Sequence, residues 1–194
     1  VWSWRSARWA PAIGYRPHMS TLSLQTPRLR LRRARMDDLA DIHAVLSDPL
    51  AMRYWSTLPH QTLAQSEDWL RAMVAADPAL SDDFVIEFEG RVIGKAGCWR
   101  RPDIGYVLHS SHWRKGLGRE ALQAVISHLF AAHVGPQALR ADVDPRNQAS
   151  LGLLASLGFV ETHRASRTWH IGDEWCDSVY LALPRDAWPA RRCA

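Results

Sequence analysis

The sequence predicts a single α/β domain in which helices cover a mixed β-sheet. Its 194 residues are enough for one domain with a sizeable core, and 47% apolar against 23% charged residues is typical of a globular protein. Local patterns run in the order strand, two helices, three strands, helix, strand, helix and two strands. No internal repeat or interdomain linker interrupts that order. The alternation favours one α/β sandwich built on a mixed sheet.

The first elements are a strand and two helices. Residues Arg28–Arg32 alternate polar and apolar, which is the period of a half-buried strand. Asp37 and Asp38 mark the start of a helix that ends at Asp48-Pro49. A second helix is expected from about Thr62 to Ala76. The side chains expected to face the core from this helix are Leu63, Trp69, Leu70 and Met73.

Three strands and a long helix are expected next. Phe84–Phe88 and Val92–Trp99 flank Glu89-Gly90-Arg91, a hairpin pattern with glycine in the turn. The strand Ile104–Leu108 follows, and a helix is expected from about Gly116 to Ala132.

The last third of the sequence predicts a strand, a helix and a final pair of strands. Leu139–Val143 is strand-like, and Pro145 and Asn147 introduce a helix that Gly158 closes. Two late strands are expected around Phe159–His170 and Trp175–Leu183, with the turn at Ile171–Glu174 between them.

The positive charge is concentrated at the start of the chain. Residues 1–36 hold eight arginines and no acidic residue, so the rest has 16 basic against all 20 acidic residues. The body is therefore mildly acidic, and we expect no nucleic-acid surface. No run of 18 apolar residues occurs, so no membrane-spanning helix is expected. The Trp and Arg content of residues 1–18 leaves an organelle-targeting or membrane-surface role as an alternative, but we expect no membrane partner. We expect a basic, poorly ordered extension at 1–21 with Met19 as an alternative start, a domain at 22–188 and a tail at 189–194.

The cysteines indicate neither a disulfide framework nor a metal. Cys98, Cys176 and Cys193 are odd in number, scattered, and lack Cys-x-x-Cys spacing. A cluster of histidines at 109, 112, 128 and 133 has no cysteine or carboxylate at metal-ligand spacing. We therefore expect a reducing, cytoplasmic setting and no metal.

A loop between the Ile104 strand and the long helix has the properties of a pyrophosphate site. Gly116 and Gly118 allow close backbone approach because they have no Cβ atom. The first N–H groups and the positive dipole end of the following helix favour an anion.

These motifs resemble the GNAT superfamily of N-acetyltransferases over about residues 22–188. The pyrophosphate pattern (Gln/Arg)-x-x-Gly-x-(Gly/Ala) falls on Trp113–Gly118, with Trp at its first position. That departure is similar to the ribosomal-protein N-terminal acetyltransferase (RimJ/RimL-like) branch. The residues that fit this branch's central pattern are Gly105, Tyr106, Leu108, Trp113, Lys115, Gly116, Gly118, Glu120 and Ala121. Three further blocks resemble the branch, namely Thr26–Arg32, Asn147–Glu161 and Asp177–Trp188.

The resemblance implies a GNAT-like fold with a mostly antiparallel sheet, and acetyl-CoA as cosubstrate without a metal. It implies that Asn147 binds the cofactor arm, that Ser150 protonates the departing thiolate, and that a strand bulge at Tyr106–Leu108 polarises the thioester. The residues expected to bind the cofactor are Tyr106, Val107, Leu108, Trp113, Arg114, Lys115, Gly116, Leu117, Gly118, Arg119 and Asn147. Asn147 and Ser150 are equally interpretable as residues that cap a helix start.

The general base is left open by the sequence. Asp103 is the candidate nearest in sequence to the expected reaction centre, and Glu87, Glu120, Glu161 and His109 are the others. Glu120 is also interpretable as a structural or ion-paired residue. Tyr54, Trp55 and Trp99 are candidates for lining an acceptor pocket, although aromatic residues are more often part of the core.

The expected activity is direct transfer of acetyl to a primary amine, first of all a protein or peptide N-terminus. With a pKa of about 7.8, roughly one α-amine in seven is neutral at pH 7, against about one lysine side chain in 2,500. Two alternatives remain: a small-amine acceptor such as a polyamine, an aminoglycoside or an amino-acid derivative, and a non-catalytic acyl-CoA sensor. A homodimer is a family-based expectation.

Overall fold

A computed structural model describes residues 22–131 and 136–188 of the chain. The expected extension at 1–21 and the tail at 189–194 lie outside the described residues, as does His133. No helix among the described residues is both long and apolar enough to cross a membrane.

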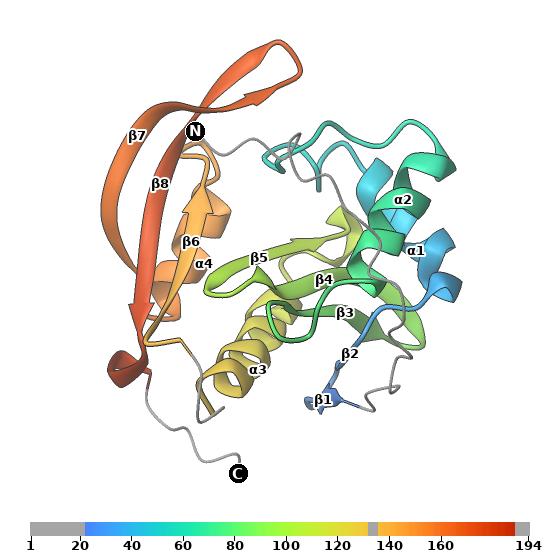
Figure 1. Cartoon of the computed structure of the whole chain (residues 1–194), viewed down its shortest axis with the longest axis horizontal. Helices are drawn as coiled ribbons and strands as arrows, with labels where there is room; N and C mark the ends of the chain where they lie inside the picture. Colours follow the sequence, from blue (N-terminus) through green and yellow to red (C-terminus); the bar gives the residue numbers. More distant parts are fainter. Residues whose placement is uncertain (1–21, 132–135, 189–194) are drawn as a thin grey trace.

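The described residues form one eight-stranded mixed sheet with four α-helices (Figure 1). The strands lie in the order β1-β2-β3-β4-β5-β6-β8-β7, and β5–β6 is the parallel pair. Their bounds are β1 Ser23–Gln25, β2 Arg30–Arg32, β3 Asp82–Phe88, β4 Arg91–Arg100, β5 Asp103–Leu108, β6 Ala138–Val143, β7 Val160–Ile171 and β8 Glu174–Pro184. The single domain with a mixed, mostly antiparallel sheet is thus confirmed.

The helices lie close to their predicted positions. Their bounds are α1 Leu39–Ser47, α2 Leu63–Val74, α3 Leu117–Ala131 and α4 Gln148–Ser156, with short 3-10 turns at Met36–Asp38, Ser110–His112 and Arg185–Ala187. α2 starts at a capping box, because Thr62 Oγ1 accepts from Gln65 N–H and the Gln65 side chain accepts from Thr62 N–H. The prediction for Leu63 is wrong, since it is about half exposed at the first turn, whereas Leu70 is fully buried.

The two faces of the sheet carry different helices. On β3, Phe84 and Ile86 belong to the larger core, which α3 joins through side chains such as Leu122 and Ile126. Val85, which points to the opposite face, belongs to a second core with residues of α1 and α2. Consecutive residues on the central strands therefore point to different helices.

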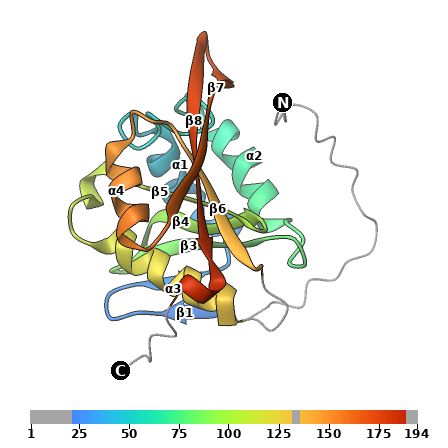
Figure 2. The same ribbon diagram turned by 90° about the vertical axis from the view of Figure 1, so that its left-hand side faces the viewer.

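One strand escaped prediction, and the last two strands lie within one residue of their predicted bounds. β1 is only three residues long and pairs with β2, so it has too few positions for a period to show. β7 and β8 form a long hairpin that extends beyond the body of the domain (Figure 2). Its turn contacts the loop between α1 and α2, because a Cβ on Gly172 would lie 3.4 Å from the Leu58 side chain.

Candidate active site

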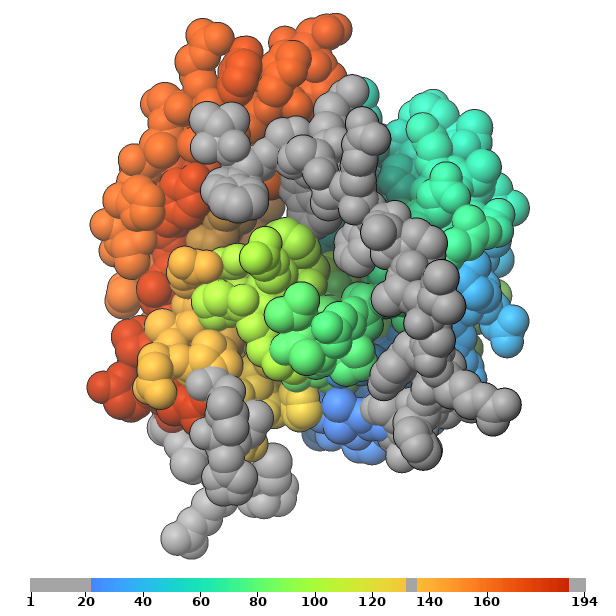
Figure 3. Space-filling view, viewed as in Figure 1, coloured from blue at the N-terminus to red at the C-terminus, as the bar shows by residue number. Residues whose placement is uncertain are grey.

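The sheet opens between β5 and β6. These strands pair at Asp103 and Arg140 alone, while β6 continues to pair with β8 along its whole length. The edge of β5 that faces β6 therefore has no strand partner from Ile104 to Leu108 among the described residues. In the space-filling view, the β7–β8 hairpin and the α1–α2 side lie on either side of this central part of the sheet (Figure 3).

Two hydroxyl groups meet across this opening. Tyr106 projects from β5 and Ser150 from the first turn of α4, the helix that follows β6, and their hydroxyls are hydrogen-bonded. Burial raises the pKa of Tyr106 to about 12, although the bond to Ser150 acts in the opposite direction. The phenol is therefore protonated at neutral pH. The sequence predicted a catalytic role for Ser150 but only a main-chain role for Tyr106. No sequence pattern around Tyr106 indicates a contact with a residue 44 positions away.

The predicted bulge at Tyr106–Leu108 is wrong in its position. The register between β4 and β5 is continuous from Ile104 to Leu108, and its shift falls between Cys98 and Arg100. The divergence of β6 is what leaves the β5 backbone without a partner, because the parallel pairing stops after one residue. Of the three residues, Val107 and Leu108 have buried side chains, so only their main chains face the opening.

The chain turns sharply just before α3 begins. Arg114 and Gly116 have φ values of 57° and 77°, and Leu117 begins the helix. Two positive φ angles turn the chain sharply, so the N–H groups of the first helical turn point away from the helix body. Leu117 is buried in the core and fixes this turn, whereas a Cβ on Gly118 would only contact Leu153 of α4 at 3.7 Å.

The loop before α3 is tied to the β1–β2 turn. Glu120 accepts hydrogen bonds from Thr26 Oγ1 (2.6 Å) and from the main-chain N–H (2.9 Å) and Nε (2.7 Å) of Arg28. Arg28 Nη1 also donates to the Lys115 carbonyl (2.8 Å). Burial alone would raise the pKa of Glu120, but the bonds from Thr26 and Arg28 outweigh it and hold that pKa below its usual value. The interpretation of Glu120 as a structural, ion-paired residue fits this contact.

Of the remaining side chains of the motif, two are hydrogen-bonded to neighbouring elements and two are exposed positive charges. Trp113 Nε1 donates to the Leu108 carbonyl (2.8 Å) and so fixes the loop to the end of β5. Arg119 donates to Ser156 Oγ (2.7 Å) and thereby links α3 to α4. Arg114 and Lys115 are exposed and form no side-chain hydrogen bond among the described residues.

Asn147 is the N-cap of α4, and its Oδ1 accepts from Ser150 N–H at 3.1 Å. The capping interpretation therefore holds for Asn147, whereas the Ser150 hydroxyl is turned to Tyr106 instead of to a backbone N–H group. Both residues border the opening, and the structure brings them together with Tyr106.

The candidate bases lie apart from the two hydroxyls or are bound elsewhere. Asp103 is ion-paired with Arg140 (3.0 Å) where β5 and β6 still touch, three residues or about 10 Å of strand from Tyr106. Glu87 pairs with Arg32 (2.8 Å), and Glu161 pairs with Arg164 (2.8 Å). His109 bonds the nearby Ser111 hydroxyl (2.9 Å).

The comparison with known proteins now decides the family. Residues 28–160 match the family model described as an acetyltransferase (GNAT) domain. The chain belongs to the GNAT family of acetyltransferases. It is therefore an acyltransferase, and the arrangement of strands and helices described above is that of a GNAT domain.

Curated relatives and solved structures agree with this assignment. The chain is 30% identical to the uncharacterized N-acetyltransferase p20 of Bacillus licheniformis, over 71% of this chain and 82% of that protein. It is also 30% identical to the L-amino acid N-acyltransferase MnaT of Escherichia coli, over 81% and 95% of the two chains. The fold is similar to that of RimL, the ribosomal L7/L12 α-N-protein acetyltransferase solved with coenzyme A, with a TM-score of 0.75, 18% identity and coverage of 86% and 99%.

This GNAT domain also holds a buried ion pair that the sequence did not reveal. Lys95 of β4 donates to Asp83 of β3 at 2.7 Å, with side chains only 3% and 8% exposed. Trp55 lies over Lys95, with Nζ 5.6 Å from the ring centre. The one available signal was a lysine inside an otherwise apolar strand, and lysines in such strands usually reach solvent. Trp55 was predicted to line an acceptor pocket, and it faces β5 here.

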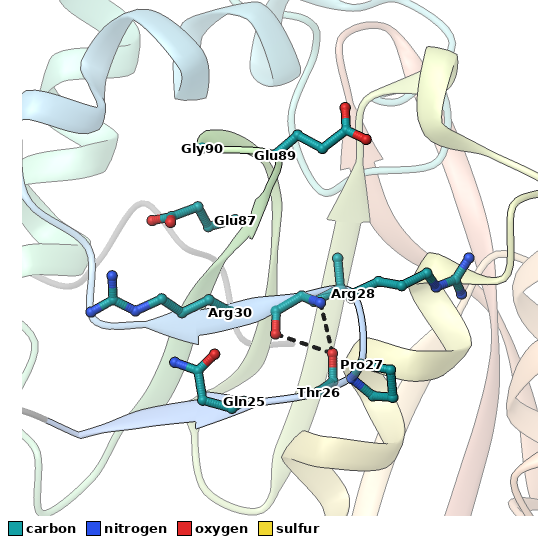
Figure 4. Close-up of a pocket in the computed structure, with 9 residues that line it drawn as sticks. Gln25, Thr26, Pro27, Arg28, Arg30, Glu87, Glu89 and Gly90 are labelled. Carbon is teal, nitrogen blue, oxygen red and sulfur yellow. Dashed lines mark hydrogen bonds between the residues drawn. The ribbon is translucent and has the colours of Figure 1, made fainter.

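A surface pocket lies at the β1–β2 end of the GNAT sheet, away from the Tyr106–Ser150 hydroxyl pair. It lies between the β1–β2 turn and the β3–β4 turn (Figure 4). The residues that line it are Gln25, Thr26, Pro27, Arg28, Leu29, Arg30, Glu87, Glu89 and Gly90. Because β3 and β4 separate β2 from β5, this pocket does not border the opening beside Tyr106.

Proposed function

We propose that this GNAT domain transfers acetyl directly from acetyl-CoA to an α-amine, as found on peptide N-termini and free amino acids. The observation that carries the proposal is the Tyr106–Ser150 hydroxyl pair across the opening beside the unpaired edge of β5. Acetyl-CoA supplies an activated acyl group as a thioester. A binding groove for a long cosubstrate needs main-chain donors on one wall, an anion site at one end and a proton donor at the reacting atoms.

The anion site is the start of α3. The backbone N–H groups from about Arg114 to Arg119 would hold the diphosphate, because a helix start has unpaired donors and a positive dipole end. Arg114 and Lys115 add two exposed positive charges beside them. Trp113, Glu120 and Arg28 hold the loop in place from behind.

The unpaired edge of β5 is the wall of the groove. Main-chain groups of Tyr106, Val107 and Leu108 can bond the extended arm of the cosubstrate in the manner of a neighbouring strand. An N–H group directed at the thioester oxygen stabilises the charge that develops there and can lower the barrier by a few kcal/mol. Asn147 lies at the opposite wall, where its amide N–H₂ can donate to the same arm.

The hydroxyl pair supplies the proton for the leaving group. As the C–N bond forms and the C–S bond breaks, the sulfur gains negative charge and the amine loses its proton. Tyr106 enters the step protonated, and Ser150 passes its proton to the sulfur while it takes one from Tyr106. The proton that the nitrogen loses returns to Tyr106 through solvent, so the sulfur gains one proton, the amine loses one, and both hydroxyls are restored. A thiol pKa near 8.5 makes this demand modest.

The acceptor class follows from the weak supply of bases near the hydroxyl pair. An α-amine is partly neutral at pH 7 and needs little deprotonation, unlike a lysine or polyamine nitrogen. Two similar proteins support the same class: RimL is named as a ribosomal-protein α-N-acetyltransferase and MnaT as an L-amino acid N-acyltransferase.

The test is release of free thiol from acetyl-CoA against a panel of amino acids, peptides with free N-termini, polyamines and aminoglycosides. We expect turnover with α-amines and much weaker turnover with the other amines. Turnover confined to polyamines or aminoglycosides contradicts the proposed acceptor. Tight binding of acetyl-CoA with no turnover on any amine contradicts the proposed catalysis and favours an acyl-CoA sensor.

A further inference from the structure

The row of residues that crosses the centre of the sheet contains two glycines. Asp83 of β3 pairs with Gly97 of β4, which pairs with Gly105 of β5. A Cβ atom on Gly97 would lie 2.8 Å from Asp83 Oδ1, and a Cβ on Gly105 would lie 3.9 Å from both Lys95 Nζ and Trp55. The absence of side chains at both positions gives the Asp83–Lys95 pair its place directly above β5.

This ion pair lies on the opposite face of β5 from the hydroxyl pair. Gly105 and Tyr106 are consecutive, so they face opposite sides of the strand. Tyr106 packs against the core of α3 and meets Ser150, whereas Gly105 lies under Lys95 and Trp55. Asp83 and Lys95 therefore lie on the α1–α2 face of the sheet, where both are nearly inaccessible to solvent.

The ion pair is incompletely satisfied. Asp83 Oδ2 accepts from Lys95, but the buried Oδ1 has no hydrogen-bond partner in the described part of the chain. Lys95 has three N–H donors, and its hydrogen bond to Asp83 uses a single donor. A buried carboxylate oxygen without a hydrogen-bond partner lowers the stability of the folded protein. A purely structural role of the ion pair does not explain why this cost is retained. One acceptor position and two donor positions are thus left for a ligand.

These free positions match the two charges of an amino acid. An α-amino acid carries an ammonium group and a carboxylate on the same carbon atom, and a peptide N-terminus has only the first. Building on the proposed function, we propose that Asp83, Lys95 and Trp55 form the site for the head group of a free α-amino acid. Asp83 Oδ1 accepts a hydrogen bond from the acceptor amino group, which attacks in its neutral form, Lys95 pairs with the acceptor carboxylate, and Trp55 covers both.

The experiment compares acceptors that differ only in the carboxylate. The common L-amino acids, each paired with its α-carboxamide, are assayed for thiol release by the wild-type protein, with Asp83→Asn and Lys95→Met alongside. For the side chains that are accepted, we expect kcat/KM to be roughly tenfold to a hundredfold higher for the acid than for the amide. Lys95→Met should bring this ratio to about one, and Asp83→Asn should raise KM for both forms.

The matched control is Asp82→Asn. Asp82 is equally buried and ion-paired, but it points to the other face, where it meets Arg33, Arg101 and His128. Its loss should leave the acid-to-amide ratio unchanged. Because a single change leaves a buried charge unpaired, the double variant Asp83→Asn/Lys95→Met is included. The affinity of each variant for acetyl-CoA, measured by calorimetry, shows that it is folded.

The possible results separate the head-group site from the proposed function. Equal turnover of acids and amides by the wild-type protein, or a preference that Lys95→Met retains in a variant with normal acetyl-CoA affinity, overturns the head-group site. Turnover of peptides alone also overturns it but leaves the proposed function intact. Turnover of no α-amine at all overturns both.

Discussion

Tyr106 and Ser150 are the residues in which the structure adds most to the chemistry. Tyr106 lies on β5 and Ser150 on α4, the helix that follows β6. Their hydroxyls meet where the edge of β5 loses its strand partner. A serine at the start of a helix commonly caps it, but Asn147 already performs that task. The Ser150 hydroxyl is therefore not needed to cap α4, and it bonds Tyr106 instead.

Ser150→Ala should lower kcat by roughly tenfold to a hundredfold and leave acetyl-CoA affinity within about twofold, because the hydroxyl acts on the leaving group. Steady-state thiol release and calorimetric titration of acetyl-CoA measure the two effects. Ser47→Ala, which removes a hydroxyl bonded only to carbonyls of its own helix α1, is the control. An unchanged kcat in Ser150→Ala would reduce Ser150 to a structural residue.

Tyr106 predicts a difference in alkaline stability. Its pKa is raised above the value in the unfolded chain, so its contribution is fully present below about pH 10 and is lost as pH rises toward about 12. A shift of this size corresponds to about 2–3 kcal/mol. Urea unfolding of the wild type and Tyr106→Phe at about pH 8 and pH 11 should show a larger alkaline loss in the wild type. Equal losses would show that Tyr106 ionises as readily in the folded protein as in the unfolded chain.

At the scale of elements, the start of α3 depends on a contact that comes from far away in the sequence. Thr26 and Arg28 in the β1–β2 turn bind Glu120, and Arg28 also holds the Lys115 carbonyl. The short strand β1, which no sequence pattern predicts, therefore has a role in supporting the loop expected to bind the diphosphate. Trp113 supports the same loop from the end of β5.

Glu120→Gln should destabilise the protein by about 1 kcal/mol, because the glutamine amide cannot accept all the hydrogen bonds that the carboxylate accepts. The loss is no larger because the ion pair with half-exposed Arg28 adds little to stability. The pKa of Glu120 is lowered, so its contribution is present above the unfolded pKa and is lost as pH falls through the folded one. Chemical denaturation at about pH 7 and pH 3 measures the difference between variant and wild type. We expect that difference to shrink in acid, and a difference that is constant with pH would contradict the assigned role.

At the scale of the whole molecule, the sheet consists of two parts, β1 to β5 and β6 to β8. Among the described residues, the two parts share one pair of strand residues, Asp103 and Arg140, and the larger hydrophobic core. A ligand that bridges β5, α3 and α4 should stabilise both parts together. At a concentration of 100 times its Kd, acetyl-CoA should raise the free energy of unfolding by about 2.7 kcal/mol. Thermal unfolding with acetyl-CoA, and with adenosine as a control lacking the diphosphate, measures this. No stabilisation at saturating acetyl-CoA would show that the opening is not its binding site.

The sequence predicted those parts of the fold that depend on local periodicity. The positions of α3 and of the hairpin β3–β4 agree to within about two residues with expectations from spacing and turn residues. The short β1, the exposed Leu63 and the register shift near Cys98 were not predictable, because tertiary contacts decide them. For the same reason the sequence indicated Gly116 and Ser150 but not the Asp83–Lys95 pair, whose members are joined only by strand pairing.

The most direct measurement is calorimetric titration of acetyl-CoA into Gly116→Val and Gly90→Val. Both glycines have φ near 77°, so both changes strain the backbone similarly, but Gly116 lies before α3 and Gly90 lies in the β3–β4 turn. We expect Gly116→Val to abolish binding and Gly90→Val to retain wild-type affinity. Wild-type affinity in a folded Gly116→Val variant would contradict the claim that the start of α3 binds the diphosphate.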